Sequence, residues 1–421
     1  ACSSDESTTP PVAQNAPQAV AFDTYVPNAT RAGQTDVMST STLQSTGFGV
    51  FAYKTEGDYT NTVNPNFMYN QKVTYSSSAW EYSPLKYWPN NTANDMDNAE
   101  GHATTTVAEK VSFFAYAPYV NAANDPSVTE SGWQVGITGF SENNSAGDPT
   151  VGYKVATVPS NSVDLLWGVA PSAGLSYSSV ASSTTDINIA SGKPLTNLLK
   201  PAKDQKMKFM FQHALARLGL SVVAAVDQVA AGGNLDEKTK IVIEKVVIKD
   251  YSTVDACKLA TTADLNLNNA TANVANWTNK NINTTLELTI DNNNELESSL
   301  QWVPNGTAIK KDDSFKKGGV TTYEKPLIGN NKYFMLIPND ASNKTGLEVE
   351  ITYYVLTRDE QLADKYSVVK NVITKKVQVA FESGKAYNLK LILGLTSVKL
   401  DAEVANWVVG STTDVDLPKN N

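Results

Sequence analysis

Residues that could perform chemistry are scarce in this chain. It holds two His and two Cys among 421 residues, too few for the usual imidazole and thiolate metal sites. The sequence contains no GxGxxG, P-loop, HExxH, CxxC or GxSxG motif. His213 lies in an apolar stretch and is expected to be a buried, hydrogen-bonded core residue, whereas His102 lies in a polar loop. The sequence therefore predicts no catalytic residue, no cofactor and no metal, and we expect a protein that is not an enzyme.

One loop has the composition of a calcium site. Carboxylate and amide side chains gather there, at Asn91, Asn94, Asp95, Asp97, Asn98 and Glu100. Oxygen ligands suit Ca²⁺, but the loop lacks the twelve-residue pattern of an EF-hand. We therefore favour a solvated acidic loop. A pair of glycosidase carboxylates distant in the sequence stays an open alternative, because such pairs need not be neighbours along the chain.

Aromatic residues form one tight cluster, at Trp80, Tyr82, Tyr87 and Trp88. They could form a platform on which a sugar stacks, or a hairpin that packs across a β-sandwich. Aromatic side chains favour half-buried positions on a pleated sheet. The packed hairpin is therefore the preferred interpretation.

The two cysteines lie in different contexts. Cys2 follows a small residue and precedes Asp5-Glu6 and a polar tether, which resembles the start of a bacterial lipoprotein and the surface-export signal of Bacteroidetes lipoproteins. We expect Cys2 to carry lipid that anchors the chain to the outer membrane. Cys257 is expected to be a small, partly buried side chain. A disulfide between the two is possible only if Cys2 is unlipidated, and nothing in the sequence supports it.

Composition narrows the class of protein. The net charge is -9 and the sequence pI is near 4.9, with no basic cluster, which argues against binding to nucleic acid or anionic lipid. Charged residues make up only 18% of the chain, and Asn, Ser and Thr fill many polar positions. This usage favours an exported, β-rich protein. The length indicates two or three domains, and no apolar run is long enough for a membrane-spanning helix.

The N-terminal segment has two parts. Residues 3–17 are mostly Ser, Thr, Pro, Ala and Gln and predict a flexible tether. In 20–26, Val20, Phe22, Thr24 and Val26 alternate with the other face, which predicts an isolated strand. Arg31 follows in a loop with Pro and Gly and is the only basic residue before Lys54, so it is an accessible target for a protease that cleaves after Arg.

Short strands separated by turns dominate the rest of the chain. In the first half we expect strands at 48–53, at 80–82, at 111–118 and at 163–168, with 67–75 forming two short strands about a turn. Residues 171–206 read as a linker region, and 214–218 as one helical turn before a strand. In the second half, period-two alternation predicts strands at 241–248, 286–290, 333–337, 347–355, 376–381, 387–393 and 398–404. The pattern predicts all-β sandwiches.

Several stretches together resemble the fimbrillin family of Bacteroidales, the type V pilins, and above all its major-fimbrillin-like branch. The residues that carry the resemblance are Phe67–Gln71, Val73-Thr74, Trp80–Pro89, Ser112–Tyr119, Phe211–Leu218 and Gly384–Leu389. The resemblance covers about 30 to 410. It implies two tandem transthyretin-like β-sandwich domains, which we place at 32–200 and 201–421, after a tether and removable first strand at 1–31.

The resemblance also implies an assembly mechanism. In the family a protease cuts after an Arg, the first strand leaves, and the groove accepts a strand from another subunit. Arg31 is the matching position here, and 398–409 is the best donor candidate, although the tail after Val404 is short for a stalk subunit. The implied function is a structural or adhesive subunit of a cell-surface pilus, with other pilin subunits, the outer membrane and surface receptors or glycans as partners. The alternatives are a surface glycan-binding lipoprotein that uses Trp80 or Trp133, and a secreted β-sandwich hydrolase.

Overall fold

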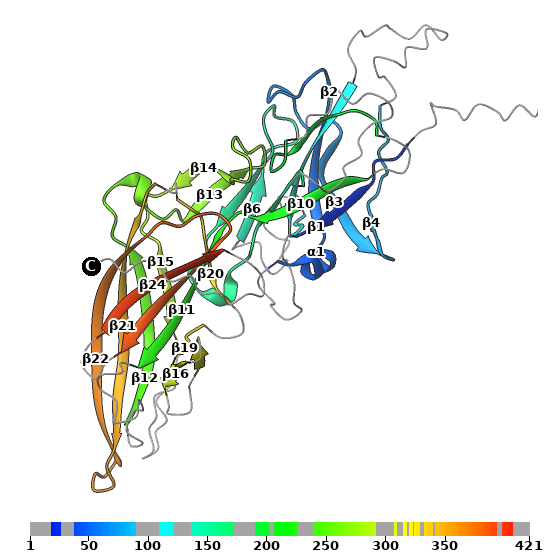
Figure 1. Ribbon diagram of the computed structural model, residues 1–421. Helices are drawn as coiled ribbons and strands as arrows, with labels where there is room; N and C mark the ends of the chain where they lie inside the picture. Colours follow the sequence, from blue (N-terminus) through cyan, green and yellow to red (C-terminus); the bar gives the residue numbers. More distant parts are fainter. Residues whose placement is uncertain are drawn as a thin grey trace, which may run out of the picture.

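Strands make up most of the molecule, which extends as two lobes joined end to end (Figure 1). The computed structural model describes residues 18–26, 38–89, 109–121, 136–171, 190–201, 206–224, 239–291, 307–309, 315–317, 320–322, 324–328, 332–339, 342–393 and 398–406. Within these residues the strands form an eight-stranded sheet, two five-stranded sheets, a four-stranded sheet and a two-stranded ribbon. The predicted all-β class is confirmed.

An eight-stranded sheet dominates the N-terminal lobe. Its order is β1 (Phe22–Tyr25), β10 (Met207–His213), β8 (Leu166–Val169), β5 (Glu109–Ala117), β2 (Phe48–Glu56), β3 (Met68–Ser76) and β4 (Ala79–Glu81), with β9 (Leu195–Leu198) also paired to β5. Every pairing is antiparallel except that of β1 with β10, which is parallel. Residues 67–75 therefore form one strand and not the expected two, and the expected linker contains β9, because Leu195 and Leu198 are buried.

Both faces of this sheet are covered. Along β2 the alternating side chains Phe51 and Tyr53 enter one core cluster, while Phe48 and Val50 enter another, as the period of a strand requires. The first face packs against the four-stranded sheet of β6 (Gly136–Phe140), β7 (Thr150–Lys154), β13 (Thr262–Asn266) and β14 (Asn276–Asn281). Helix α1 (Thr40–Thr46) covers part of the second face with Leu43.

The C-terminal lobe consists of two facing sheets. One contains β11 (Ala216–Ala224), β19 (Glu324–Pro326), β20 (Phe334–Leu336), β23 (Lys385–Leu393) and β24 (Val398–Asn406). The other contains β12 (Thr239–Asp250), β15 (Glu287–Asp291), β16 (Thr307–Ile309), β21 (Thr345–Arg358) and β22 (Tyr366–Val379). A ribbon of β17 (Phe315–Lys317) and β18 (Val320–Thr322) and the 3-10 turns η2 (Pro159–Asn161) and η4 (Asp255–Cys257) complete the described elements.

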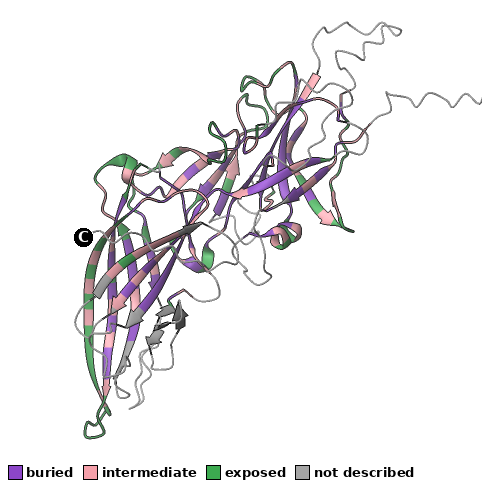
Figure 2. Ribbon diagram, in the orientation of Figure 1, coloured by how far each residue is buried: buried purple, intermediate pink, exposed green. Residues whose placement is uncertain are grey.

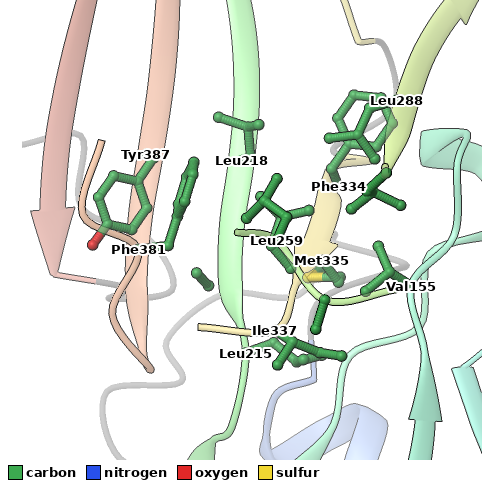
Figure 3. Packing of buried hydrophobic residues seen from close by; sticks show 14 of the residues in the cluster. Val155, Leu215, Leu218, Leu259, Leu288, Phe334, Met335, Ile337, Phe381 and Tyr387 are labelled. Atoms are coloured by element: carbon green, nitrogen blue, oxygen red, sulfur yellow. The ribbon is translucent and has the colours of Figure 1, made fainter. Parts of the chain in front are cut away.

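The two lobes share one core. Only Ala214 and Leu215 separate β10 from β11, and both are fully buried. Buried residues run along the strands through this junction (Figure 2). Figure 3 shows the packing of side chains that both lobes contribute, among them Val155, Leu215, Leu218, Leu259, Phe334, Ile337 and Tyr387. The junction is therefore packed like the interior of a domain.

Strand pairing crosses residue 200 in two places. Strand β10 joins the sheet of the N-terminal lobe, and β13 pairs with β7 along five residues, from Thr262↔Lys154 to Asn266↔Thr150. The helical turn expected at 214–218 is wrong. The Ala214 amide N–H donates to the Leu165 carbonyl, and from Ala216 onward the chain pairs with β20 and β23. The sheet partners on both sides of the chain outweigh a weak local helical preference.

Candidate functional site: the edge strand and its groove

Strand β1 occupies the edge of the eight-stranded sheet. It runs parallel to β10, with Phe22 opposite Met207 and Thr24 opposite Phe209. The Met207 amide N–H donates to the Ala21 carbonyl oxygen at 2.6 Å. The isolated strand that the sequence indicated at 20–26 is therefore present at 22–25, with its own edge position.

The segment 82–88 lies along the start of β1, on the side opposite β10. The Val20 amide N–H donates to the Lys86 carbonyl at 2.8 Å, and the Trp88 amide N–H donates to the Gln18 carbonyl at 2.9 Å. Ala19 and Tyr87 form an isolated antiparallel bridge. Residues 18–26 thus lie in a groove between β10 and the segment 82–88, and main-chain hydrogen bonds form on both sides.

The inward face of the strand fills this groove. Val20 and Phe22 are each 1% exposed, Val26 is 4% exposed and Thr24 is 8% exposed. Phe22 is the centre of an aromatic cluster, with ring centroids 5.5 to 6.0 Å from those of Phe48, Tyr82, Phe113 and Phe209. Edge-on and offset contacts at these distances add to the stabilisation from burial alone.

Tyr82 connects the segment 82–88 to the chain that leads into β1. Its hydroxyl donates to the Val20 carbonyl at 2.8 Å and accepts from the Lys86 amide at 3.3 Å. Burial of the ring raises the pKa of the Tyr82 hydroxyl above its ordinary value. On the solvent side, Lys208 on β10 pairs with Asp23 at 3.7 Å, and both side chains are partly exposed. The sequence pattern identifies Tyr82 only as a member of an aromatic cluster, because its contact with Val20 joins residues that are 62 positions apart in the chain.

The structure describes only some of the residues that the sequence singled out. Cys2, Arg31 and Trp133, and the loop with Asp95, Asp97, Glu100 and His102, lie outside the described residues. His213 is buried as expected. Cys257 is half-buried and forms no disulfide.

The rings of Trp80, Tyr82 and Trp88 pack against other side chains of the protein. The Trp80 ring lies edge-on to Phe48 and Tyr75, with centroids 5.0 and 5.1 Å apart. Trp88 is 3% exposed, and only Tyr87 of the four points to solvent, with 51% of its surface exposed. The packed hairpin is therefore the correct interpretation, and these rings offer no stacking platform.

The described residues hold neither a metal-binding cluster nor a helix that could span a membrane. No group of three or more His, Cys, Asp and Glu side chains lies close enough there to hold a metal ion. No helix in the same part of the chain is long and apolar enough to cross a bilayer. The groove around β1 is therefore the candidate functional site.

Known proteins resemble this chain in sequence and in fold. The chain is 25% identical to the fimbrium subunit Fim1C of Phocaeicola vulgatus over 411 residues, which are 95% of this chain and 91% of that protein. The crystal structure of a fimbrial protein from Bacteroides vulgatus has the same fold, with a TM-score of 0.61 and 21% identity over 92% of this chain and 99% of that one. No protein-family model matches.

The chain is an all-β protein that shares its fold with a fimbrial protein of known structure. The resemblance to the fimbrillin family of Bacteroidales that the sequence indicated is confirmed by these two comparisons.

Proposed function

We propose that this chain is a structural subunit of a cell-surface fimbria that assembles by strand exchange. The observation that carries the proposal is the position of β1, an edge strand whose inward side chains fill an aromatic groove. Cleavage after Arg31 would separate this strand from the rest of the chain. The emptied groove would then accept an extended segment of another subunit, which is a known mode of strand addition.

The free energy of groove filling favours capture of a partner. Loss of β1 would uncover apolar positions that Val20, Phe22 and Val26 now fill, and each is worth roughly 1.5–3 kcal/mol when buried. The unpaired edge of β10 would also present free main-chain donors and acceptors. A contact of this kind is head-to-tail and does not close on itself, so it grows into a filament.

The donor segment that we propose is 398–406. Its first seven residues match 20–26 in pattern, because Val398, Asp401 and Val404 correspond to Val20, Asp23 and Val26, with Leu400 in place of Phe22 and Ala402 in place of Thr24. Both segments alternate an apolar face with a polar one. In its own subunit β24 is an edge strand paired with β23, and Leu400, Ala402 and Val404 are only half-buried. It can therefore leave its sheet at less cost than a central strand.

Asp23 and Asp401, on the polar faces of the two segments, support an alignment of Val398 with Val20. Asp23 lies opposite Lys208 on β10, and Asp401 lies opposite Lys390 on β23. A donor strand aligned as Val398 to Val20 would place Asp401 beside Lys208. The donor would then place Val398, Leu400 and Val404 in the apolar positions of the strand that it replaces and repeat its surface ion pair.

The location and partners follow from the same proposal. Cys2 would carry the lipid that brings the chain to the outer membrane, and other pilin subunits would be the main partners. Receptors or glycans on host or bacterial surfaces would meet the assembled fimbria. The division into a tether at 1–31 and sandwiches at 32–200 and 201–421 is retained as a proposal, with β10 and β13 completing sheets across residue 200.

Limited digestion with trypsin, followed by size analysis, tests the proposal. Wild-type protein cut after Arg31 should form higher oligomers, whereas Arg31→Ala should resist this cut and stay monomeric. A synthetic peptide of residues 397–406 should bind the cut protein and block growth, and a peptide with Leu400→Ser should not. A cut protein that has released β1, stays folded and binds no donor would contradict the proposal.

A further inference from the structure

We infer that Thr24 makes β1 a replaceable occupant of its groove, and that the groove prefers a strand with an apolar residue at this position, such as Ala402. This inference rests on the proposed strand exchange and names a residue that determines which strand the groove holds. Its basis is a buried hydroxyl on the inward face of β1 that has no hydrogen-bond partner among the described residues.

The Thr24 side chain is enclosed by apolar neighbours. It is 8% exposed and shares the inward face of the strand with Val20 and Phe22, because side chains two residues apart point the same way. The register of β1 and β10 places it opposite Phe209, which is fully buried. The nearest residue on β10 therefore presents an aromatic ring, which is no strong acceptor for a hydroxyl.

The Thr24 hydroxyl weakens the strand that carries it. Oγ1 of Thr24 is buried and has no partner among the described residues, whereas the Thr24 amide N–H donates to Oδ1 of Asp23 at 2.9 Å. A hydroxyl that leaves water and gains no hydrogen bond destabilises the state in which it is buried. Strand β1 thus has a cost that an apolar side chain of the same shape would not have.

The groove also contains an unsatisfied donor while β1 is bound. Trp88 belongs to the same core cluster as Val20 and Phe22, and its indole Nε1 is buried without a partner among the described residues. The main chain of the strand is better held, since the Tyr82 hydroxyl donates to the Val20 carbonyl and the Val26 amide donates to Oγ1 of Thr40. Strand β1 is therefore bound through its backbone but is not the full complement of the groove interior.

The donor segment differs from β1 at two inward positions, with opposite effects. In the alignment of Val398 with Val20, Leu400 takes the place of Phe22, and Ala402 takes the place of Thr24. The four ring contacts of Phe22 favour β1. The Thr24 hydroxyl offsets part of this advantage, and Ala402 brings no hydroxyl into the groove.

Cleavage determines when this cost takes effect. Before the cut, β1 belongs to the same chain as its groove, and such a connection gives a high effective concentration, of the order of millimolar for a short flexible linker. A strand of modest affinity therefore stays in place. After a cut behind Arg31, only the affinity of the strand itself retains it, and the Thr24 hydroxyl favours its replacement.

The test measures how much 397–406 peptide displaces half of the N-terminal fragment from the protein cut after Arg31. Thr24→Val replaces the hydroxyl by a methyl group of the same shape and should raise the required concentration about tenfold, equivalent to about 1.4 kcal/mol. Ala21→Thr and Ala21→Val form the control pair, because Ala21 is half-buried on the outward face of the strand. These two variants should require equal concentrations, since water can reach the added hydroxyl.

The donor peptide gives a second, reciprocal measurement. Peptides with Ala402→Thr and Ala402→Val have the same shape at the position of Thr24 and differ only by the hydroxyl. On the cut wild-type protein, the Thr peptide should displace the fragment about tenfold less effectively than the Val peptide. Equal displacement by the two peptides would overturn the role of this position.

The uncut protein separates this inference from the strand exchange itself. Thr24→Val should raise the urea midpoint of the uncut chain, because the buried hydroxyl is removed without loss of shape. An unchanged midpoint together with an unchanged peptide requirement would overturn the inference and leave strand exchange intact. Failure of the peptide to displace any fragment from the cut wild-type protein would instead contradict strand exchange, whatever the midpoint of Thr24→Val.

Discussion

Oδ2 of Asp164 lies 2.9 Å from Nδ1 of His213, at the end of β10, and both side chains are buried. The same carboxylate oxygen accepts the amide N–H of Met38 at 2.9 Å. One buried carboxylate therefore ties together three segments, which are the chain that leads into α1, the chain before β8 and the last residue of β10. The contacts of this carboxylate give it a structural role, because they hold the three segments together.

Removal of the imidazole should destabilise the protein. His213→Ala leaves the Asp164 carboxylate with one hydrogen-bond partner fewer in a buried place, which is expected to lower the free energy of unfolding by about 1–3 kcal/mol. Urea denaturation followed by tryptophan fluorescence measures the change. Val254→Ala, at an exposed position, serves as the control and should have little effect. An unchanged midpoint for His213→Ala would show that the pair contributes nothing.

Truncation of Phe22 should loosen the edge strand. Phe22→Ala removes a ring that contacts four other aromatic rings, and such core truncations typically lower stability by about 3–5 kcal/mol. Hydrogen exchange should then become faster at 20–26 and along β10. Val274→Ala, at an exposed position, is the matched control. Equal protection in Phe22→Ala and the wild type would mean that the ring does not hold the strand.

Alkaline pH should weaken the groove through Tyr82. Its pKa is raised in the folded protein by burial, so the neutral hydroxyl is favoured by folding. This contribution is fully present below the unfolded pKa of about 10 and is lost as the pH rises through the higher folded pKa. The melting temperature of the wild type should therefore fall more steeply above about pH 10 than that of Tyr82→Phe. Parallel curves for the two proteins would rule out this contribution of Tyr82.

Charge reversal should report the register of the donor. In the cut protein, a 397–406 peptide with Asp401→Lys should bind more weakly than the wild-type peptide, because its ammonium would face Lys208. Lys208→Glu in the acceptor should restore binding of this peptide and weaken the original one. For a partly exposed pair the expected change is about two- to fivefold in Kd. Additive effects in this double-mutant cycle would place Asp401 elsewhere.

The local pattern of apolar and polar residues was sufficient to predict many of the strands. Period-two alternation at 20–26 and 347–355 predicted β1 and most of β21, because the residues that alternate are those that face the core. Partners were not predictable in this way. Nothing near Ala263 in the sequence specifies that its strand pairs with β7, and nothing near Asp164 specifies contact with residues 38 and 213. Such contacts are set by the register of strands far apart in the chain. The same limit applies at 214–218, where the local pattern predicts a helical turn and the long-range pairing with β20 and β23 produces a strand.

The near-unbroken course of β10 into β11 has a mechanical consequence. Strand β10 flanks the groove and β11 flanks β23, and the two buried residues between them leave little slack. In a filament built as proposed, tension on one subunit would pass from the captured strand to β10, through residues 214 and 215, and out along β23. Because the captured strand and its neighbour would lie along the pulling direction, their hydrogen bonds would be loaded in shear and would have to break together. The fimbria would then resist stretching through the backbone of 207–224, without relying on the surface between the lobes.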